Sequence, residues 1–144
     1  MEKKIKVFAM RCSENKVYKG RIEEIENTLE AKQKFVEGYI QCISLTNEID
    51  IILNDEGKLM GLPFNRVWRD KNGNILDILV GNVLVCRHNA NGDFTSIFED
   101  DIPVIVEKLP AIVSVIGRNV FISREEDLPE YEEKMENDNA SKQS

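Results

Sequence analysis

The chain has little of what most catalytic and metal sites are built from. Its 144 residues include one histidine and three cysteines, and no Cys-x-x-Cys pair. Because Cys12, Cys42 and Cys86 are odd in number and far apart, we expect reduced thiols rather than disulfides or a zinc site. Motifs for a nucleophilic serine, a phosphate loop or dinucleotide binding are also missing. We therefore predict no enzyme activity, no metal and no cofactor.

Long apolar runs are missing as well. No run approaches the roughly 18 residues that a membrane-spanning helix needs. The N-terminal residues carry several charges, but they lack the apolar core and cleavage site of a signal peptide. We therefore expect a cytoplasmic protein with no membrane association.

The sequence has an excess of negative charge. The formal net charge of −7 argues against broad binding to DNA or RNA, because such binding needs a basic surface. Most of the excess lies in one short run near the C-terminus, so the rest of the chain is closer to neutral and is compatible with a small anionic ligand. The acidic residues of this run are Glu125, Glu126, Asp127, Glu130, Glu132, Glu133 and Glu136.

The N-terminal part predicts a β-hairpin followed by a helix. Residues 3–10 alternate imperfectly between apolar and polar, and residues 17–22 provide an antiparallel partner. Asn27 is placed to cap a helix that runs to about residue 37, and Gly38 suits the left-handed residue that ends it. Glu30 completes the capping box. The side of the helix expected to face the core consists of Leu29, Gln33, Phe35 and Val36, and the side expected to face solvent consists of Glu30, Lys32 and Lys34.

The next segment predicts paired strands. Residues 39–45 alternate, and residues 49–53 form a nearly continuous apolar run. Residues 54–57 are expected to close a tight hairpin in which Gly57 supplies a positive φ, so that residues 58–60 begin the return strand.

A long strand and a second helix are expected further on. Residues 75–87 form the longest strand candidate, and Gly81 predicts a bulge or a close approach to the backbone. A capping box at Ser96 predicts a helix start, and Pro103 divides that helix into two short pieces. The alternative is a helix that begins only at residues 100–101.

The C-terminal part predicts added strands and a tail. Residues 112–122 form a strand pair or a bent strand, which pairs either within the chain or across a subunit interface. Residues 127–130 predict a last short helix, and disorder is expected from residue 137. We predict one α+β domain over residues 1–124, with a mostly antiparallel sheet and two helices on one face, followed by an acidic segment over residues 125–144.

One segment looks suited to a ligand rather than to packing. Phe64, Asn65 and Arg66 follow a proline and combine an aromatic face, an amide and a guanidinium. A nucleotide is bound by such groups, through stacking, an edge hydrogen bond and a charge-assisted bond to phosphate. The alternatives are a core position for Phe64 and a surface ion pair for Arg66.

Further candidates lie after this segment. Phe94 precedes two hydroxyl residues, Thr95 and Ser96, at the expected helix start, where free backbone amides suit an anion. Arg118 lies in a turn after a strand and is placed to reach a phosphate in this subunit or a neighbouring one. Capping, core packing and solvation are the structural alternatives for these side chains.

Several motifs resemble a small family of phage and plasmid proteins, most of which are described only as a domain of unknown function. The motifs are IENTLEAKQKFVEGYI at residues 25–40, NDEGKLMGLPFNR at residues 54–66, DILVGN at residues 77–82 and GDFTSI at residues 92–97. They occur in the family's order, and the similarity covers about residues 5–97. The family in turn resembles the type-one Thoeris anti-defence proteins of phages.

This second resemblance implies a function. Those phage proteins are oligomeric α+β sponges that bind a cyclic ADP-ribose isomer, and some bind cyclic oligonucleotides, without cleaving them. By this resemblance we expect a homo-oligomer in the host cytoplasm that sequesters a cyclic nucleotide immune signal. The motif and loop residues whose chemistry suits the ligand are Phe64, Asn65, Arg66, Gly81, Asn82, Phe94, Thr95, Ser96 and Arg118.

The alternative function is an acidic protein-binding inhibitor. The charge of residues 125–136 would then imitate nucleic acid or steer the protein toward a basic host enzyme. A solvated acidic tail explains the same residues without any partner.

Overall fold

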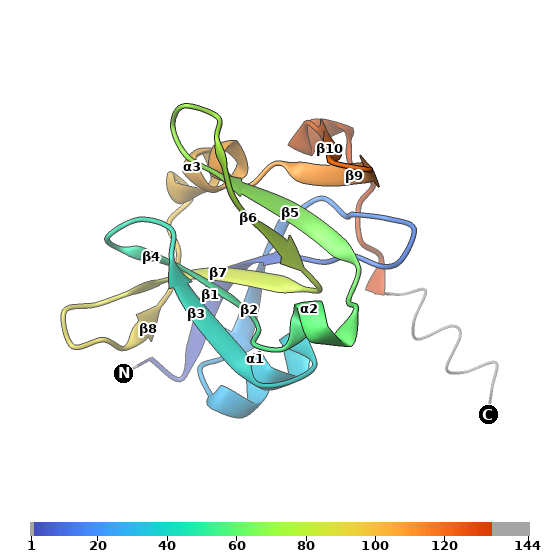
Figure 1. Ribbon diagram of the computed structural model, residues 1–144. Coiled ribbons are helices and arrows are strands. Elements are labelled where there is room, and N and C mark those ends of the chain that lie inside the picture. The colour runs from blue at the N-terminus through green and yellow to red at the C-terminus, as the bar shows by residue number, and fades with distance from the viewer. Residues whose placement is uncertain (1, 134–144) are drawn as a thin grey trace, which may run out of the picture.

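The protein forms two antiparallel sheets in the computed structural model, which describes residues 2–133 (Figure 1). The first sheet has the strand order β2-β1-β7-β4-β3, with the short β8 paired to β7, and the second has the order β10-β9-β5-β6. The predicted α+β class with mostly antiparallel strands is therefore confirmed. The strands are β1 (Lys4–Met10), β2 (Arg21–Glu26), β3 (Ile40–Ser44), β4 (Ile49–Asn54), β5 (Phe64–Arg69), β6 (Ile75–Val80), β7 (Val83–His88), β8 (Phe94–Thr95), β9 (Ala111–Ile116) and β10 (Asn119–Ser123).

Short helices cover these sheets. α1 (Leu29–Val36) packs against β3, β4 and β7, whereas α3 (Asp101–Lys108) contacts β5. α2 (Gly57–Met60) is a single turn in the connection between β4 and β5, and a 3-10 turn (Glu125–Asp127) follows β10. Figure 1 shows α1 at the lower end of the molecule and α3 at the upper end.

The core forms where β1, β4 and β7 lie side by side. Every residue of β4 is buried, because this strand has neighbours on both edges and is covered on both faces. Ile51 and Leu84 are fully buried, and Val36 of α1 and Ile105 of α3 join the same apolar cluster. Burial of such a side chain contributes about 1.5–3 kcal/mol relative to exposure.

The predicted β1–β2 hairpin is confirmed, but its second strand begins later than expected. β2 begins at Arg21 rather than at residue 17. The backbone before it has other partners: the N–H of Lys19 donates to the carbonyl of Pro129 at 2.7 Å, and the N–H of Gly20 donates to Glu125 at 2.7 Å. A contact with the C-terminal segment therefore replaces the start of the strand.

The predicted helix exists as α1, but its caps differ from the prediction. Thr28, not Asn27, is the N-cap, and its hydroxyl accepts from the N–H of Ala31 at 3.1 Å. Glu37, not Gly38, is the left-handed residue, with φ 64°. Gly38 is needed for a different reason, because a Cβ there would lie 2.6 Å from the Asn54 side chain.

The predicted faces of α1 were wrong for two residues. Leu29, assigned to the core, is 52% exposed, whereas Lys32, assigned to solvent, is only 3% exposed. The Lys32 ammonium donates to the side chain of Asn27 at 2.9 Å and to the carbonyl of Thr28 at 3.2 Å. It also lies 5.0 Å from the centre of the Phe94 ring. These partners replace water and allow a lysine to face inward.

The predicted tight hairpin at residues 54–57 was wrong. Gly57 begins α2, and the left-handed glycine is Gly61, with φ 69°. The Asn54 side chain accepts from the N–H of Glu56 at 2.8 Å, which favours a local turn over a strand reversal. The chain thereby passes from β4 of the first sheet to β5 of the second.

Gly81 separates two strands that the sequence joined into one. β6 ends at Val80 in the second sheet, and β7 begins at Val83 in the first. Gly81 has φ 74°, and a Cβ there would lie 2.8 Å from the Leu62 side chain. The interruption expected at Gly81 is therefore the crossing point between the sheets.

The second helix begins at the later of the two predicted starts. α3 begins at Asp101, so Pro103 falls in its first turn, and the prediction of two helical pieces from Ser96 was wrong. Residues 112–122 form the β9–β10 hairpin, which pairs with β5 of the same chain.

The short helix predicted near the C-terminus is confirmed as a 3-10 turn at Glu125–Asp127. It begins slightly before residues 127–130, which were expected to cap it. Residues 128–133 continue past the β1–β2 connection, as the end of the coloured chain in Figure 1 shows. The tail predicted to be disordered from residue 137 lies outside the described residues.

Candidate functional site

Asn65, expected to contact a ligand, lies in the interior. Its side chain is fully buried, and its amide donates to the carbonyls of Met10 and Gly81 at 3.0 and 2.7 Å. These bonds join β5 to the end of β1 and to the crossing between β6 and β7. The side chain therefore connects the two sheets.

Arg66 is also fully buried and is bound on several sides. Its guanidinium donates to the carbonyl of Tyr18 at 2.9 Å, to the carbonyl of Leu109 at 3.3 Å, and to the carboxylate of Glu125. Because this guanidinium is inaccessible to solvent, the geometry does not support its predicted contact with a phosphate. The group instead fixes the C-terminal segment to the domain.

The loop of Phe94, Thr95 and Ser96 packs on the first sheet. Phe94 and Thr95 form β8, and the Ser96 hydroxyl accepts from a backbone N–H of β1 at 2.9 Å. The helix N-terminus predicted here is absent because α3 begins only at Asp101. These residues therefore have packing and hydrogen-bonding roles in this structure.

The other predicted residues are spread over the molecule. Phe64 is 48% exposed at the start of β5, and Arg118 lies exposed in the turn between β9 and β10. Gly81 is buried under Leu62. The nine predicted residues, all within the described part of the chain, thus share no single pocket, and Asn82 alone lines the pocket that we describe next.

An open pocket of about 430 Å³ lies between the end of β1, β2, α1 and the C-terminal segment. Its wall combines aromatic, cationic and amide groups. The residues that line it are Arg11, Cys12, Ser13, Tyr18, Glu23, Ile25, Ala31, Lys34, Phe35, Glu37, Asn82, Tyr131 and Glu133.

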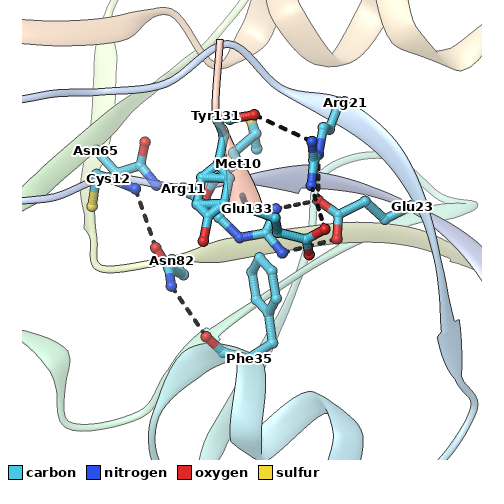
Figure 2. Close-up of polar contacts among 10 residues, drawn as sticks. All are labelled: Met10, Arg11, Cys12, Arg21, Glu23, Phe35, Asn65, Asn82, Tyr131 and Glu133. Atoms are coloured by element: carbon cyan, nitrogen blue, oxygen red, sulfur yellow. Dashed lines mark hydrogen bonds and ion pairs between the residues drawn. The ribbon is translucent and has the colours of Figure 1, made fainter. Parts of the chain in front are cut away.

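Arg11 is the central group of this pocket, between two aromatic rings (Figure 2). Its guanidinium carbon lies 4.7 Å from the centre of the Phe35 ring and 4.4 Å from the centre of the Tyr131 ring. The edge of the guanidinium forms a bidentate pair with Glu23, in which one of the two bonds measures 2.8 Å. The rings and the carboxylate together fix the plane of Arg11.

Arg21 adds a second cation at the same wall. It donates to Glu23 at 2.8 Å and to the carbonyl of Tyr131 at 3.2 Å, and it lies 3.5 Å from Glu133. Figure 2 shows Arg11 and Arg21 converging on Glu23 from two sides. One carboxylate therefore orients both guanidinium groups.

Electrostatics keeps this group of side chains charged near neutral pH. Burial alone would lower the pKa of Arg11, but the hydrogen bond and the charge of Glu23 outweigh burial and raise it. Burial alone would raise the pKa of Glu23, but hydrogen bonds from Arg11 and Arg21, together with their charges, lower it overall. The site thus carries fixed charges in a partly desolvated wall.

Asn82 ties the inner side of the pocket to α1. Its oxygen accepts from the backbone N–H of Cys12 at 3.1 Å, and its amide donates to the carbonyl of Phe35 at 3.3 Å (Figure 2). The Cys12 thiol is close by, and burial raises its pKa to about 11, so it stays neutral at pH 7. A protonated thiol is a poor nucleophile, and the pocket is better suited to binding than to covalent chemistry.

No pattern in the sequence marks Arg11, Phe35 and Tyr131 as one site. Arg11 follows the predicted strand of residues 3–10, Phe35 was assigned to the inner stripe of a helix, and Tyr131 lies within the acidic run. A pairing of the C-terminal segment with residues 18–21 brings them together, and no local pattern predicts that pairing.

Two further findings concern residues 2–133 as a whole. They contain no group of three or more histidine, cysteine, aspartate or glutamate side chains arranged to hold a metal ion. None of their helices has the length and hydropathy of a membrane span.

Comparison with known proteins places the chain in a family. No curated protein and no solved structure is significantly similar to it. The model of one protein family matches residues 9–110, which is more than half of the chain. The match ends before β9, so the β9–β10 hairpin and the C-terminal wall of the pocket lie outside it. The chain belongs to the family described as domain of unknown function (DUF3846).

Proposed function

We propose that this protein binds a small nucleotide in the Arg11 pocket and releases it unchanged. The observation that carries the proposal is the Arg11 guanidinium, which lies over the rings of both Phe35 and Tyr131. A planar cation beside aromatic faces suits a ligand that has both a base and a phosphate. Lys34 and Asn82 line the same pocket and add a second cation and an amide.

The size of the pocket fits such a ligand. Its volume of about 430 Å³ lies within the range of roughly 300–1,000 Å³ that is usual for small-molecule sites. The mixed charge of the wall also limits where the phosphate can lie, because Glu23, Glu37 and Glu133 would repel an anion placed beside them. We therefore place the phosphate near Lys34 and the base near the Arg11 guanidinium.

The resemblance to Thoeris anti-defence proteins narrows the proposed ligand. It favours a cyclic ADP-ribose isomer or a cyclic oligonucleotide, sequestered as an immune signal by a phage protein. Sequestration needs affinity and abundance but no turnover. An affinity in the low nanomolar range corresponds to about −12 kcal/mol, which requires stacking, charge-assisted bonds and enclosure together.

Enclosure of that kind is easiest between subunits, so a homo-oligomer is part of the proposal. The β9–β10 hairpin supplies apolar side chains for contact: Val113, Ile116, Phe121 and Ile122 are between 46% and 65% exposed. Light scattering at increasing concentration tests this point. If the protein is strictly monomeric and still binds a nucleotide, binding does not require an oligomer and only the oligomer proposal fails.

The acidic inhibitor is the second candidate, and several contacts weaken it. Glu125 is paired with the buried Arg66, Asp127 with Arg124, and Glu133 with Arg21. Part of the acidic run is therefore engaged within the chain rather than presented to a basic partner.

The deciding experiment is a calorimetric titration with cyclic ADP-ribose isomers and cyclic di- and trinucleotides. Bound ligand is then released by heat and identified by mass spectrometry. We expect saturable binding and an intact ligand. Arg11→Ala should weaken binding at least about tenfold through loss of the cation on which the base is placed.

The matched control is Arg118→Ala, which removes an exposed arginine from the β9–β10 turn. It should leave affinity unchanged if the Arg11 pocket is the site. Equal losses in both variants would reject this pocket. Absence of heat with every ligand would reject nucleotide binding and direct attention to host proteins as partners.

A further inference from the structure

The Arg11 pocket is closed on one side by the protein's own C-terminal segment. We call residues 125–133 the C-terminal strap. Its first half is firmly attached: Glu125 is bound by Arg66 and by the N–H of Gly20, and the carbonyl of Pro129 accepts from Lys19 at 2.7 Å. Leu128 is buried in a small apolar cluster beside β9.

The second half of the strap contacts Arg11 in the pocket and Arg21 beside it. The Tyr131 ring lies 4.4 Å from the guanidinium carbon of Arg11 and 5.2 Å from that of Arg21. Glu133 follows, with a carboxylate oxygen 3.5 Å from Arg21. In contrast to the buried Leu128, the Glu133 side chain is 62% exposed.

We infer that Tyr131 and Glu133 act as an internal competitor of the ligand. The Tyr131 ring lies on Arg11, where the base is placed, and Glu133 lines the same pocket as Lys34 and repels the phosphate placed there. Tyr131 and Glu133 are close together in the sequence, so one short segment presents both to the pocket. This inference rests on the proposed function and adds its regulation.

The geometry of Arg11 makes the competition direct. Its guanidinium lies over the ring of Phe35 from α1 and over the ring of Tyr131 from the strap. A base can take the place of the Tyr131 ring only after that ring has left Arg11. The anchors at Glu125 and Leu128 keep the strap attached, so the outer half moves while the domain stays intact.

The test compares nucleotide titrations of the full chain and its Tyr131→Ala variant. A ring on a cation at a partly exposed site is worth about two- to fivefold in a binding constant, so the variant should bind that much more tightly. Glu133→Gln should act in the same direction. Tyr39→Ala, at a tyrosine that is 70% exposed, and Glu130→Gln, at another exposed strap residue, are the matched controls.

A second readout follows the ring itself. With 3-fluorotyrosine incorporated, the Tyr131 resonance is identified by its loss in Tyr131→Phe. Saturating nucleotide should move this resonance toward the position of an exposed tyrosine. A shift in the opposite direction would mean that the ring stacks on the ligand.

The outcomes separate this inference from the proposed function. Weaker binding by Tyr131→Ala, or unchanged binding, would overturn the internal competitor and leave nucleotide binding in place. If neither chain binds any cyclic nucleotide, both proposals fail. Tighter binding with a released ring supports both.

Discussion

Two arginines of this protein, Arg66 and Arg11, have opposite surroundings. Arg66 is enclosed, and its donors are directed to backbone carbonyls and to one carboxylate. Arg11 lies in the wall of an open pocket, with its guanidinium over two aromatic rings. The same side chain serves as internal support in the first case and as a candidate recognition group in the second.

The contrast shows what distinguishes a structural arginine from a ligand-binding one. A guanidinium bound to carbonyls around its edge has its donors in use within the fold, so removing it leaves acceptors unsatisfied. In Arg11, by contrast, one carboxylate holds the edge of the guanidinium, and an aromatic ring that lies on the cation can be replaced by the aromatic base of a ligand. Substitution at Arg66 should thus affect stability, whereas substitution at Arg11 should affect binding.

The largest effect is expected for Arg66→Met. Loss of the guanidinium removes the donor shared by Glu125 and the carbonyls of Tyr18 and Leu109, and leaves Glu125 only its bond from the N–H of Gly20 among the contacts described above. We expect the free energy of unfolding to fall by about 3 kcal/mol or more, measured by urea denaturation. Arg118→Met is the control and should change it by less than about 0.5 kcal/mol. A small loss at Arg66 would show that its network contributes little to stability.

Asn65→Ala should have the next largest effect. It removes two buried hydrogen bonds, to the carbonyls of Met10 and Gly81, and should lower the free energy of unfolding by about 2 kcal/mol. Asn82→Ala removes bonds at a half-buried position and should lower it by about 1 kcal/mol. A larger loss for Asn82→Ala than for Asn65→Ala would contradict the role of Asn65 as the buried connection between the two sheets.

Arg11→Lys sharpens the comparison at the pocket. Lysine keeps the charge but lacks the flat guanidinium that packs between Phe35 and Tyr131. Nucleotide affinity should fall about tenfold, or about 1.4 kcal/mol, while the unfolding midpoint changes little. Wild-type affinity in this variant would indicate that charge alone matters and that the stacked geometry does not.

The smallest effect concerns pH and Glu23. Because Arg11 and Arg21 lower the pKa of Glu23 in the folded protein, its contribution to stability is present above the unfolded pKa of roughly 4.3 and is lost as pH falls through the folded value. Glu23→Gln should therefore cost about 1 kcal/mol at pH 7 and almost nothing at strongly acidic pH. Thermal unfolding of both chains across this pH range measures the difference. If the difference in stability between the wild type and Glu23→Gln does not change with pH, ionised Glu23 is not the source of that difference.

The sequence by itself determined the local elements. Alternation predicted β1 and β3, the apolar run predicted β4, and the turn residues placed most of the connections. These features depend on the period of side chains along a strand and on the backbone preferences of glycine, proline and asparagine, which neighbouring residues decide.

Tertiary structure decided which elements share a sheet and which side chains face inward. Gly81 marked a break, but only packing showed that β6 and β7 belong to different sheets. Lys32 turned inward because the side chain of Asn27, just before α1, and the ring of Phe94, from a distant part of the sequence, supply its partners.

The pocket was decided by tertiary structure almost entirely. Its central contact joins Arg11 to Tyr131, two residues far apart in sequence, through a strap anchored by the buried Arg66. Composition and spacing predicted a nucleotide site at Phe64 and Arg66, whereas the site that we propose lies at Arg11. The burial of Arg66 was not predictable, because burial and hydrogen-bond partners depend on long-range contacts that local sequence patterns do not encode.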